Sequence, residues 1–413
     1  MRETIINQRK ERDHLLAQSY LPRRTMYKDI EAMLNSPVIK LITGPRRVGK
    51  STQALLMLKG RNFAYLNFDD NNLLDKWNED LVMLMLDEIY PGYQYLMLDE
   101  VQNVKGWDVW VSKLYRRGVN LVITGSNANM LSGEMATLLT GRYLEIKMFP
   151  FSLQEVFDWN NLDNKDTTTS SHVITRDDYL RNGGYPETVA RRAITQSYLA
   201  SLFDAILLKD VVKRHKVRNV PDLNSIALYL LANFGNPLSY NDIASSLGLA
   251  SVSTVKKFVS YLHEPYLFYS LPRYNNKLKL MKKAPQKSYV IDNGFITACA
   301  FNTSSNLGRL LENQVMIELL RQGYEIGLSL FYYKSRNDKE TDFVVRKGTK
   351  VERLIQVCYD ISSEKTLKRE IDSIAECAGE LKCDNLTIVT NNDEGTIEKN
   401  GYTIQLVPIS KFE

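Results

Sequence analysis

The feature that most constrains this chain is an eight-residue segment, residues 44–51, with the pattern GxxxxGK[ST]. The apolar stretch Val38–Thr43 precedes it, and residues 51–58 have the composition of a helix. Such a loop wraps its N–H groups around phosphate oxygens where it joins a strand to the start of a helix. We therefore expect an α/β fold with a parallel sheet and a triphosphate site at one edge of that sheet.

Each position of this loop is a candidate nucleotide contact. The set, extended by one residue into the helix, is Gly44, Pro45, Arg46, Arg47, Val48, Gly49, Lys50, Ser51 and Thr52. Lys50 is expected to reach the β- and γ-phosphates, and the Ser51 hydroxyl is expected to bind Mg²⁺. The loop thus predicts ATP and Mg²⁺ as cofactors.

The sequence Leu-Met-Leu-Asp-Glu occurs twice, ending at Glu88 and again at Glu100. The first copy lies inside a long segment, 80–90, that has the pattern of a helix, whereas the second is short and follows a turn, as a strand does. An acid at a strand end holds Mg²⁺, and its neighbour polarises the attacking water. We therefore assign Asp99 to magnesium and Glu100 to water activation, and expect Asp87 and Glu88 to be a solvated helix end.

Two further candidates follow from the chemistry of phosphoryl transfer. The predicted strand Asn120–Thr124 ends in a polar turn in which Ser126 would lie beside the γ-phosphate; a simple strand-end turn is the alternative. Arg142 is a candidate cation for the developing charge, from its own chain or from a neighbouring copy, which would require a homo-oligomer. Arg46 and Arg47 are rivals, and a surface salt bridge is the alternative for any of them.

The pattern between residues 38 and 150 alternates short apolar runs with amphipathic segments, which is typical of βαβ units. The predicted strands are Val38–Thr43, Asn62–Phe68, Gln94–Asp99, Asn120–Thr124 and Arg142–Ile146. We divide the chain into a helical N-terminal arm (1–35), a P-loop core (36–158), a helical lid or linker (159–221), a winged-helix domain (222–285) and a final α/β domain (286–413). Residues 160–171 are polar and are expected to form an exposed loop.

The winged-helix prediction rests on two helices, Tyr240–Leu247 and Val252–Leu262, joined at Gly248. A two-stranded ribbon is expected to follow. Small polar and basic side chains at the second helix and along the ribbon can meet phosphates or base edges; they are Ser251, Ser253, Thr254, Lys256, Lys257, Arg273, Lys277, Lys279, Lys282, Lys283 and Lys287. We predict DNA contact through this helix and the basic ribbon 273–287, with a nucleotide lid or a protein-docking unit as the alternative.

The composition narrows the cellular setting. A net charge of +5 over 413 residues permits nucleic-acid contact without arguing for it. No apolar run approaches the roughly 18 residues of a membrane span, and no apolar segment of a signal peptide follows the first residues. The four cysteines form no CxxC pair, which favours reduced thiols and a cytoplasmic protein without membrane contact.

Several motifs in order resemble one family, the AAA-type prokaryotic ATPases with a DUF4143 C-terminal region. Besides the P-loop they are Leu98-Asp99-Glu100-Val101-Gln102, Thr124-Gly125-Ser126, Gly141-Arg142, Phe149-Pro150-Phe151-Ser152-Leu153-Gln154-Glu155, Gly183-Gly184-Tyr185-Pro186, Lys209-Asp210-Val211-Val212, Gly308-Arg309-Leu310-Leu311-Glu312-Asn313 and Glu340-Thr341-Asp342-Phe343. The resemblance implies a P-loop ATPase core of the additional-strand class, a winged-helix middle and a C-terminal fold similar to PD-(D/E)xK nucleases.

The nuclease-like motif is incomplete in this sequence. Glu312 and Asp342 match its first two acids, but Gln356 replaces the third acid and Cys358 stands where the lysine belongs. An amide binds Mg²⁺ more weakly than a carboxylate, and a thiol supplies no fixed positive charge. Lys334 is a conceivable substitute, and a fold kept for binding or assembly is the favoured interpretation.

Three functions are consistent with these patterns. The first is an ATP-hydrolysing switch that moves the winged-helix and nuclease-like domains. The second is a nucleotide-dependent DNA-binding or regulatory module with little turnover. The third is an ATP-gated, metal-dependent nuclease.

Overall fold

A computed structural model describes residues 1–21, 23–24, 30–131, 139, 141–163, 174–300 and 307–412. The described chain divides into two compact units. The first comprises Met1–Phe149 together with Glu264–Tyr266, and the second comprises Pro150–His263 and Leu267–Glu413. The finer division into five domains stays a prediction, and most of the expected exposed loop lies outside the described residues.

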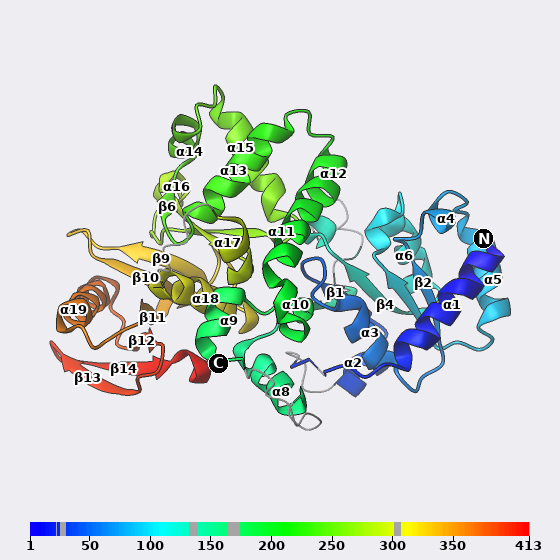
Figure 1. Cartoon of the computed structure of the whole chain (residues 1–413), viewed down its shortest axis with the longest axis horizontal. Helices are drawn as coiled ribbons and strands as arrows, with labels where there is room; N and C mark the ends of the chain where they lie inside the picture. The colour runs from blue at the N-terminus through cyan, green and yellow to red at the C-terminus, as the bar shows by residue number, and fades with distance from the viewer. Residues whose placement is uncertain are drawn as a thin grey trace. The chain divides into compact units, whose positions relative to one another are not determined.

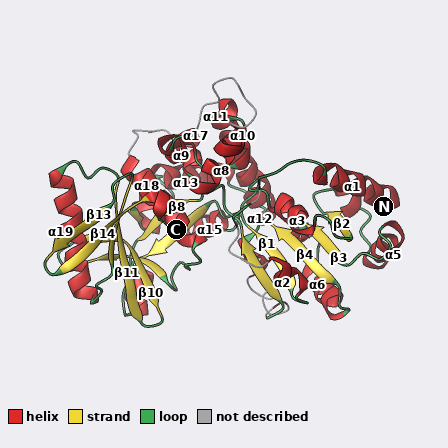
Figure 2. Cartoon of the chain, turned by 90° about the horizontal axis from the view of Figure 1, so that it is seen from below, coloured by secondary structure: helices red, strands yellow, loops and turns green. Residues whose placement is uncertain are grey.

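The first unit is a parallel sheet with helices on both faces (Figures 1 and 2). Its elements are α1 (Arg2–Leu16), α2 (Ile30–Asn35), β1 (Ile39–Thr43), α3 (Lys50–Leu58), β2 (Phe63–Asn67), α4 (Asn71–Leu74), α5 (Glu79–Ile89), β3 (Tyr95–Asp99), η1 (Val101–Asn103), α6 (Trp107–Arg116), β4 (Asn120–Gly125), η2 (Ala128–Leu131) and β5 (Tyr143–Lys147). All five predicted strands are present within one or two residues of the expected bounds.

The sheet order is β2-β3-β4-β1-β5, and every neighbouring pair is parallel. The strands read as near-continuous apolar runs because both faces are covered; β1 and β3 are buried throughout. In this order β4 separates β3 from β1, and the carboxyl ends of all three strands meet at one edge.

Helix α1 packs onto this unit. Ile5 is fully buried in the same core as β1 and β3, and the buried Gln8 side chain donates to Asn67 O (3.0 Å) and accepts from Asn67 N–H (3.0 Å). The Arg9 and Arg12 guanidinium groups lie over the Tyr90 ring. Helix α1 is therefore held to the first unit by apolar packing, by hydrogen bonds and by cation–π contacts.

The second unit begins with a helical region. Its elements up to the first strand are α8 (Leu153–Asp163), α9 (Arg176–Asn182), α10 (Pro186–Ala190), η3 (Arg192–Ile194), α11 (Thr195–Ala205), η4 (Ile206–Val212), α12 (Lys213–His215) and α13 (Val220–Ala232). A capping box starts α9, in which Thr175 Oγ1 accepts from the Asp178 N–H and Asp178 accepts from the Thr175 N–H. The middle region from α8 to α13 is thus helical in its described residues.

A small antiparallel sheet follows, and it corrects the predicted two-stranded ribbon. Its elements are β6 (Pro237–Leu238), α14 (Tyr240–Ser246), α15 (Val252–His263), β7 (Phe268–Pro272), α16 (Leu278–Lys283) and β8 (Gln286–Val290), and its strand order is β6-β8-β7. The third strand is only two residues long and includes a proline, so residue patterns gave no signal for it. The basic segment between β7 and β8 is a short helix rather than extended ribbon.

The C-terminal region is a mixed sheet of order β13-β14-β12-β11-β10-β9. Its elements are α17 (Asn293–Cys299), α18 (Leu307–Arg321), β9 (Leu330–Lys334), β10 (Glu340–Lys347), β11 (Lys350–Cys358), α19 (Glu364–Leu381), β12 (Leu386–Thr390), β13 (Gly395–Lys399), β14 (Tyr402–Pro408) and η5 (Ile409–Lys411). Helix α19 packs its apolar side on β10 and β11 (Figure 1). Among the described residues, no helix has the length and apolar character needed to cross a membrane.

Candidate functional site

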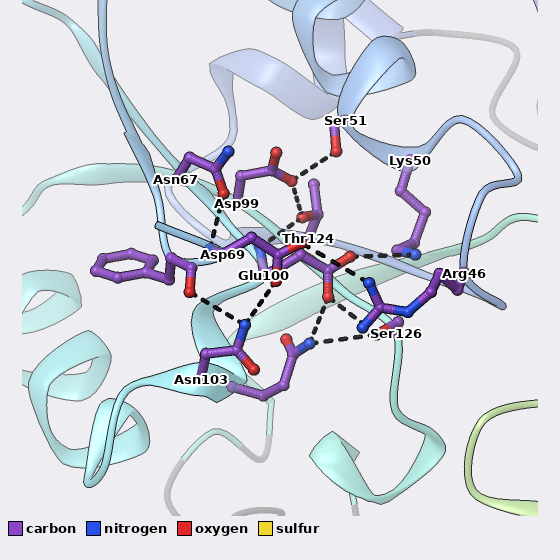
Figure 3. A network of polar contacts seen from close by, with 12 residues as sticks. Arg46, Lys50, Ser51, Asn67, Asp69, Asp99, Glu100, Asn103, Thr124 and Ser126 are labelled. Atoms are coloured by element: carbon purple, nitrogen blue, oxygen red, sulfur yellow. Dashed lines mark hydrogen bonds and ion pairs between the residues drawn. The ribbon is translucent and has the colours of Figure 1, made fainter. Parts of the chain in front are cut away.

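The predicted P-loop residues meet at the carboxyl edge of the first unit's sheet (Figure 3). Strand β1 ends at Thr43, β3 ends at Asp99 and β4 ends at Gly125, and the parallel register aligns these ends. The residues after each end are the P-loop, Glu100 and Ser126. Parallel pairing therefore gathers residues that are far apart in sequence, from Gly44 to Ser126.

The loop depends on its two glycines. Gly44 has φ +144°, and a Cβ there would lie 2.2 Å from the carbonyl oxygen of Met148, whose N–H donates to Thr43 O (2.8 Å). Gly49 has φ +92°, a conformation that L side chains rarely adopt, and it is the residue immediately before α3 begins at Lys50. Both conformations turn the chain sharply from strand to helix, as a phosphate-cradling loop requires.

The Lys50 side chain is buried at the centre of the site. Its ammonium donates to Pro45 O (3.0 Å) and lies 3.4 Å from Glu100 Oε1. Burial raises the pKa of the Glu100 carboxyl, but Lys50 and the hydrogen bonds from Gln102 and Ser126 outweigh burial, so its pKa lies below the ordinary value. Glu100 is therefore ionised at neutral pH, as a group that activates water must be.

Asp99 accepts hydrogen bonds from three hydroxyl groups. Ser51 Oγ donates to Asp99 Oδ1 over 2.8 Å, Thr124 Oγ1 donates to the same oxygen, and the Tyr65 hydroxyl donates to Oδ2 over 3.3 Å. Burial, then the neighbouring Glu100 charge, raises the pKa of Asp99 to about 6. A hydroxyl and a carboxylate side by side are hard oxygen donors that suit Mg²⁺, so the two residues predicted to bind the metal are adjacent.

Ser126 lies beside Glu100, and it brings a partner that sequence reasoning missed. Its hydroxyl donates to Glu100 Oε2 (2.9 Å), and Gln102 Nε2 donates to Ser126 Oγ (3.3 Å) and to the same carboxylate oxygen. Glu100 itself has φ +52°, which turns the chain from β3 into η1. Gln102 was visible in the sequence only as part of a family motif, because its role depends on this turn.

Of the three candidate arginines, Arg46 lies nearest the predicted residues. Its guanidinium is 3.8 Å from Asp69 Oδ2, and its charge contributes to the lowered pKa of Glu100. Arg47 is exposed and has φ +68°. A cation near the site is thus supplied by the chain's own loop.

Arg142 is not brought to the site of its own chain. It precedes β5, whose first residue pairs with Ile39 at the start of β1, whereas the P-loop follows the end of β1. Five strand residues separate these edges by about 16 Å. Arg142 Nη1 lies 3.3 Å from Ser112 Oγ, and the guanidinium lies 5.7 Å from the centre of the Tyr115 ring. A role at the site of a neighbouring copy stays a prediction.

Arg23 is a second residue that the sequence did not single out. Its guanidinium donates to Val48 O in the loop (2.8 Å) and to Phe149 O beyond β5 (2.7 Å). It therefore ties the P-loop to the neighbouring chain segment. Its position after the Leu21-Pro22 break gave no sequence signal for such a role.

The duplicated Leu-Met-Leu-Asp-Glu segment is resolved as expected. Its first copy lies on α5, where Asp87 and Glu88 are exposed. The Glu88 carboxylate accepts from Arg2 Nη2 at the surface (2.6 Å). The second copy supplies Asp99 and Glu100.

Comparison with known proteins agrees with this geometry. Models of three families match, namely an AAA domain over residues 36–157, domain of unknown function DUF8612 over 175–306 and domain of unknown function DUF4143 over 307–412. An uncharacterized protein of Methanocaldococcus jannaschii is 33% identical over 413 residues, covering 94% of this chain and 91% of the relative. The chain belongs to this AAA–DUF8612–DUF4143 family.

Other members and structures are more distant or cover less of the chain. An uncharacterized protein of Haemophilus influenzae is 33% identical over 367 residues, covering 83% of this chain and 86% of its own. Among solved structures, the Walker-type ATPase of Pyrococcus abyssi aligns with a TM-score of 0.47 and 13% identity, over 69% of this chain and 99% of that chain. The resemblance to AAA-type ATPases with DUF4143 is confirmed, and the DUF8612 match gives the middle region its own family.

Lys287 departs from two expectations, one for the nuclease-like acids and one for the basic ribbon. Glu312, Asp342 and Gln356 do come together, but the lysine among them is Lys287 from β8, while Lys334 pairs with Asp338. Lys287 is therefore unavailable to DNA, because only 1% of its side chain is exposed. The other lysines of the predicted basic ribbon, Lys277, Lys279, Lys282 and Lys283, are exposed.

Proposed function

We propose that this AAA-family protein binds ATP with Mg²⁺ and hydrolyses it, acting as a nucleotide-driven switch. The observation that carries the proposal is the convergence of Lys50, Ser51, Asp99 and Glu100 at one sheet edge. A cradle that only bound nucleotide would need no ionised carboxylate beside the phosphate-binding lysine. The position of β4 between β3 and β1 supports the additional-strand class of P-loop ATPase.

Each residue of the P-loop site has a separate role in the proposed hydrolysis. The Ser51 hydroxyl and the Asp99 carboxylate would hold Mg²⁺, which would supply positive charge to the phosphates. Lys50 exchanges its contact with Pro45 O for phosphate oxygens. The Glu100 carboxylate, released from its ion pair, accepts a proton from the water whose oxygen attacks the γ-phosphorus. The bond from that phosphorus to the β-phosphate oxygen breaks, and ADP leaves with the electron pair. Ser126 holds the carboxylate in place.

The test is Mg²⁺-dependent phosphate release by the purified chain. Lys50→Ala is expected to lose ATP binding, and Glu100→Gln is expected to keep binding while its turnover falls by about 100-fold or more. Glu88→Gln, in the duplicated segment on α5, is the matched control and should match wild type. Wild-type turnover no higher than that of Lys50→Ala would refute hydrolysis.

The switch proposal draws support from residues 264–266. This connection between α15 and β7 counts with the first unit, where Ala128 N–H donates to Glu264 O (2.8 Å) and half-buried Tyr266 hydrogen-bonds to Thr43. Thr43 precedes the P-loop, and Ala128 lies two residues past Ser126. Changes at either point therefore reach the ends of α15 and β7 through the chain itself. A protease-cleavage pattern over residues 222–290 that is identical with and without ATP would count against the switch.

DNA binding is the second candidate function. The element order α13, β6, α14, α15, β7, α16, β8 and the sheet order β6-β8-β7 support the winged-helix interpretation. The exposed residues of α15 include Ser253, Lys256, Lys257 and Ser260. Together with the four exposed lysines at α16, they form a polar and basic surface suited to phosphates.

Binding to duplex DNA should therefore depend on salt and on these lysines. The slope of log K against log salt is negative. Neutralising Lys279, Lys282 and Lys283 is expected to make it less negative by about 1 to 3. The matched control neutralises Lys365, Lys368 and Lys382, which are exposed on or just after α19. Equal slopes for the two triple variants would remove this candidate.

A further inference from the structure

The buried ammonium of Lys287 is unexplained by the P-loop chemistry. Its Nζ lies 2.9 Å from Glu312 Oε1, 2.9 Å from Asp342 Oδ1 and 2.8 Å from Glu340 Oε1. Lys287 comes from β8 in the DUF8612 region, whereas the three acids come from α18 and β10 in the DUF4143 region. A buried lysine is costly unless it is paired, and here three carboxylates surround one ammonium.

The acids are fixed in this arrangement by further hydrogen bonds. The Tyr289 hydroxyl donates to Glu312 Oε1 (2.7 Å), and the Val357 N–H donates to Asp342 Oδ2 (3.0 Å). The ammonium also lies 5.7 Å from the centre of the Tyr332 ring. The carboxylates are thus aimed at one point before any ligand arrives, and Lys287 occupies that point.

Gln356 does not complete the acid set. Its Nε2 donates to Glu370 Oε2 (2.7 Å), and its Oε1 accepts from the Asp342 N–H (3.3 Å). Cys358, the residue at the lysine position of the motif, is packed in the apolar core of the sheet. The positive charge of this centre therefore comes from another region of the chain.

We propose that Lys287 is a built-in cation that takes the place of a divalent metal ion in this acidic centre. Mg²⁺ or Mn²⁺ binds carboxylate oxygens at about 2.0 to 2.2 Å, so an ion shared by Glu312 and Asp342 would overlap the ammonium. The native centre binds no divalent ion and joins the two regions instead of cleaving a phosphodiester.

The test uses Mn²⁺ alone as the probe, counted by electron paramagnetic resonance. All variants carry Asp99→Asn, so that the P-loop site does not contribute, and that protein is the parent. Lys287→Ala is expected to bind one Mn²⁺ per chain at least tenfold more tightly than the parent. Adding Glu340→Gln and Asp342→Asn should abolish the gain, and the exposed Lys283→Ala is the control that should behave as the parent does.

Three results would overturn the proposal. One is Mn²⁺ binding by the parent that disappears with Asp342→Asn, which does not depend on how well Lys287→Ala folds. Another is a folded Lys287→Ala variant, judged by circular dichroism, with no more Mn²⁺ than the parent. The third is wild-type cleavage of plasmid with Mn²⁺ that is lost with Glu312→Gln. None of these measurements depends on ATP hydrolysis. A result that refutes the role of Lys287 therefore does not affect the proposed ATPase activity.

Discussion

Asp99 gives the sharpest link between function and stability in this molecule. Its carboxyl is buried beside Glu100, and these two causes raise its pKa from 3.8 to about 6. A carboxyl group whose pKa is raised by folding destabilises the folded state once it ionises. The nucleotide-free protein therefore loses stability as pH rises from the unfolded pKa towards 6, and the full loss is present at neutral pH.

The substitution Asp99→Asn removes this loss. From the two pKa values, the gain in free energy of unfolding is roughly 2 kcal/mol near pH 5 and about 3 kcal/mol near pH 7.5. The amide oxygen still accepts from Ser51 and Thr124, and the amide N–H₂ group is left facing the Tyr65 hydroxyl oxygen. The variant should thus be more stable than wild type without ligand and should lose the stabilisation that Mg²⁺ with ATP gives wild type.

The assay is urea unfolding in EDTA near each of these pH values, followed by thermal unfolding with Mg²⁺ and ATP. Asp87→Asn on α5 is the matched control, since Asp87 is exposed and its substitution should change stability by less than about 0.5 kcal/mol. An Asp99→Asn variant that is no more stable than wild type, or one whose advantage shrinks as pH rises, would refute the reasoning.

Two other predictions concern a glycine of the second unit, Gly183, and the side chain of Arg23. Gly183→Ala places a Cβ 1.7 Å from Asp292 Oδ1 at φ +72°, so we expect unfolding free energy to fall by about 2 to 4 kcal/mol; Gly248→Ala, at φ +65° in open space, should cost only about 1 kcal/mol in the same denaturant assay. Arg23→Ala removes the donor shared by Val48 O and Phe149 O, and we expect KM for ATP to rise about three- to tenfold with kcat little changed. An unchanged KM would show that the loop keeps its shape without Arg23.

Much of the first unit was predictable because its signals are local. The strand bounds follow from short apolar runs, and the P-loop follows from glycines whose conformations few other residues adopt. The choice between the two Leu-Met-Leu-Asp-Glu copies was also decided locally, since segment length and a flanking turn separate a helix from a strand. Parallel pairing then places Lys50, Asp99 and Ser126 together, because consecutive strand ends of such a sheet share one edge.

Roles that depend on the third dimension were not accessible in the same way. Arg142 comes just before β5, as predicted from the sequence. The register of β5 on β1 places it at the edge of the sheet opposite to the P-loop. Gln102 and Arg23 act through a left-handed turn and through two carbonyl groups, neither of which leaves a residue pattern. Side chains of this kind are identified by what they touch, and contacts between distant segments are set by packing.

Lys287 shows the limit most clearly. By itself the sequence determined a P-loop core, because the glycine and lysine spacing lies within one loop, and its resemblance to a family singled out the acids Glu312 and Asp342. It also placed Lys287 among surface lysines, since a lysine after four others in a polar segment has that local character. Only the tertiary structure decided that this one lysine is buried, because its partners lie 25 and 55 residues further along the chain and are brought to it by the packing of β8 with α18 and β10. Charge compensation in a buried centre is a property of the assembled fold, and no local pattern encodes it.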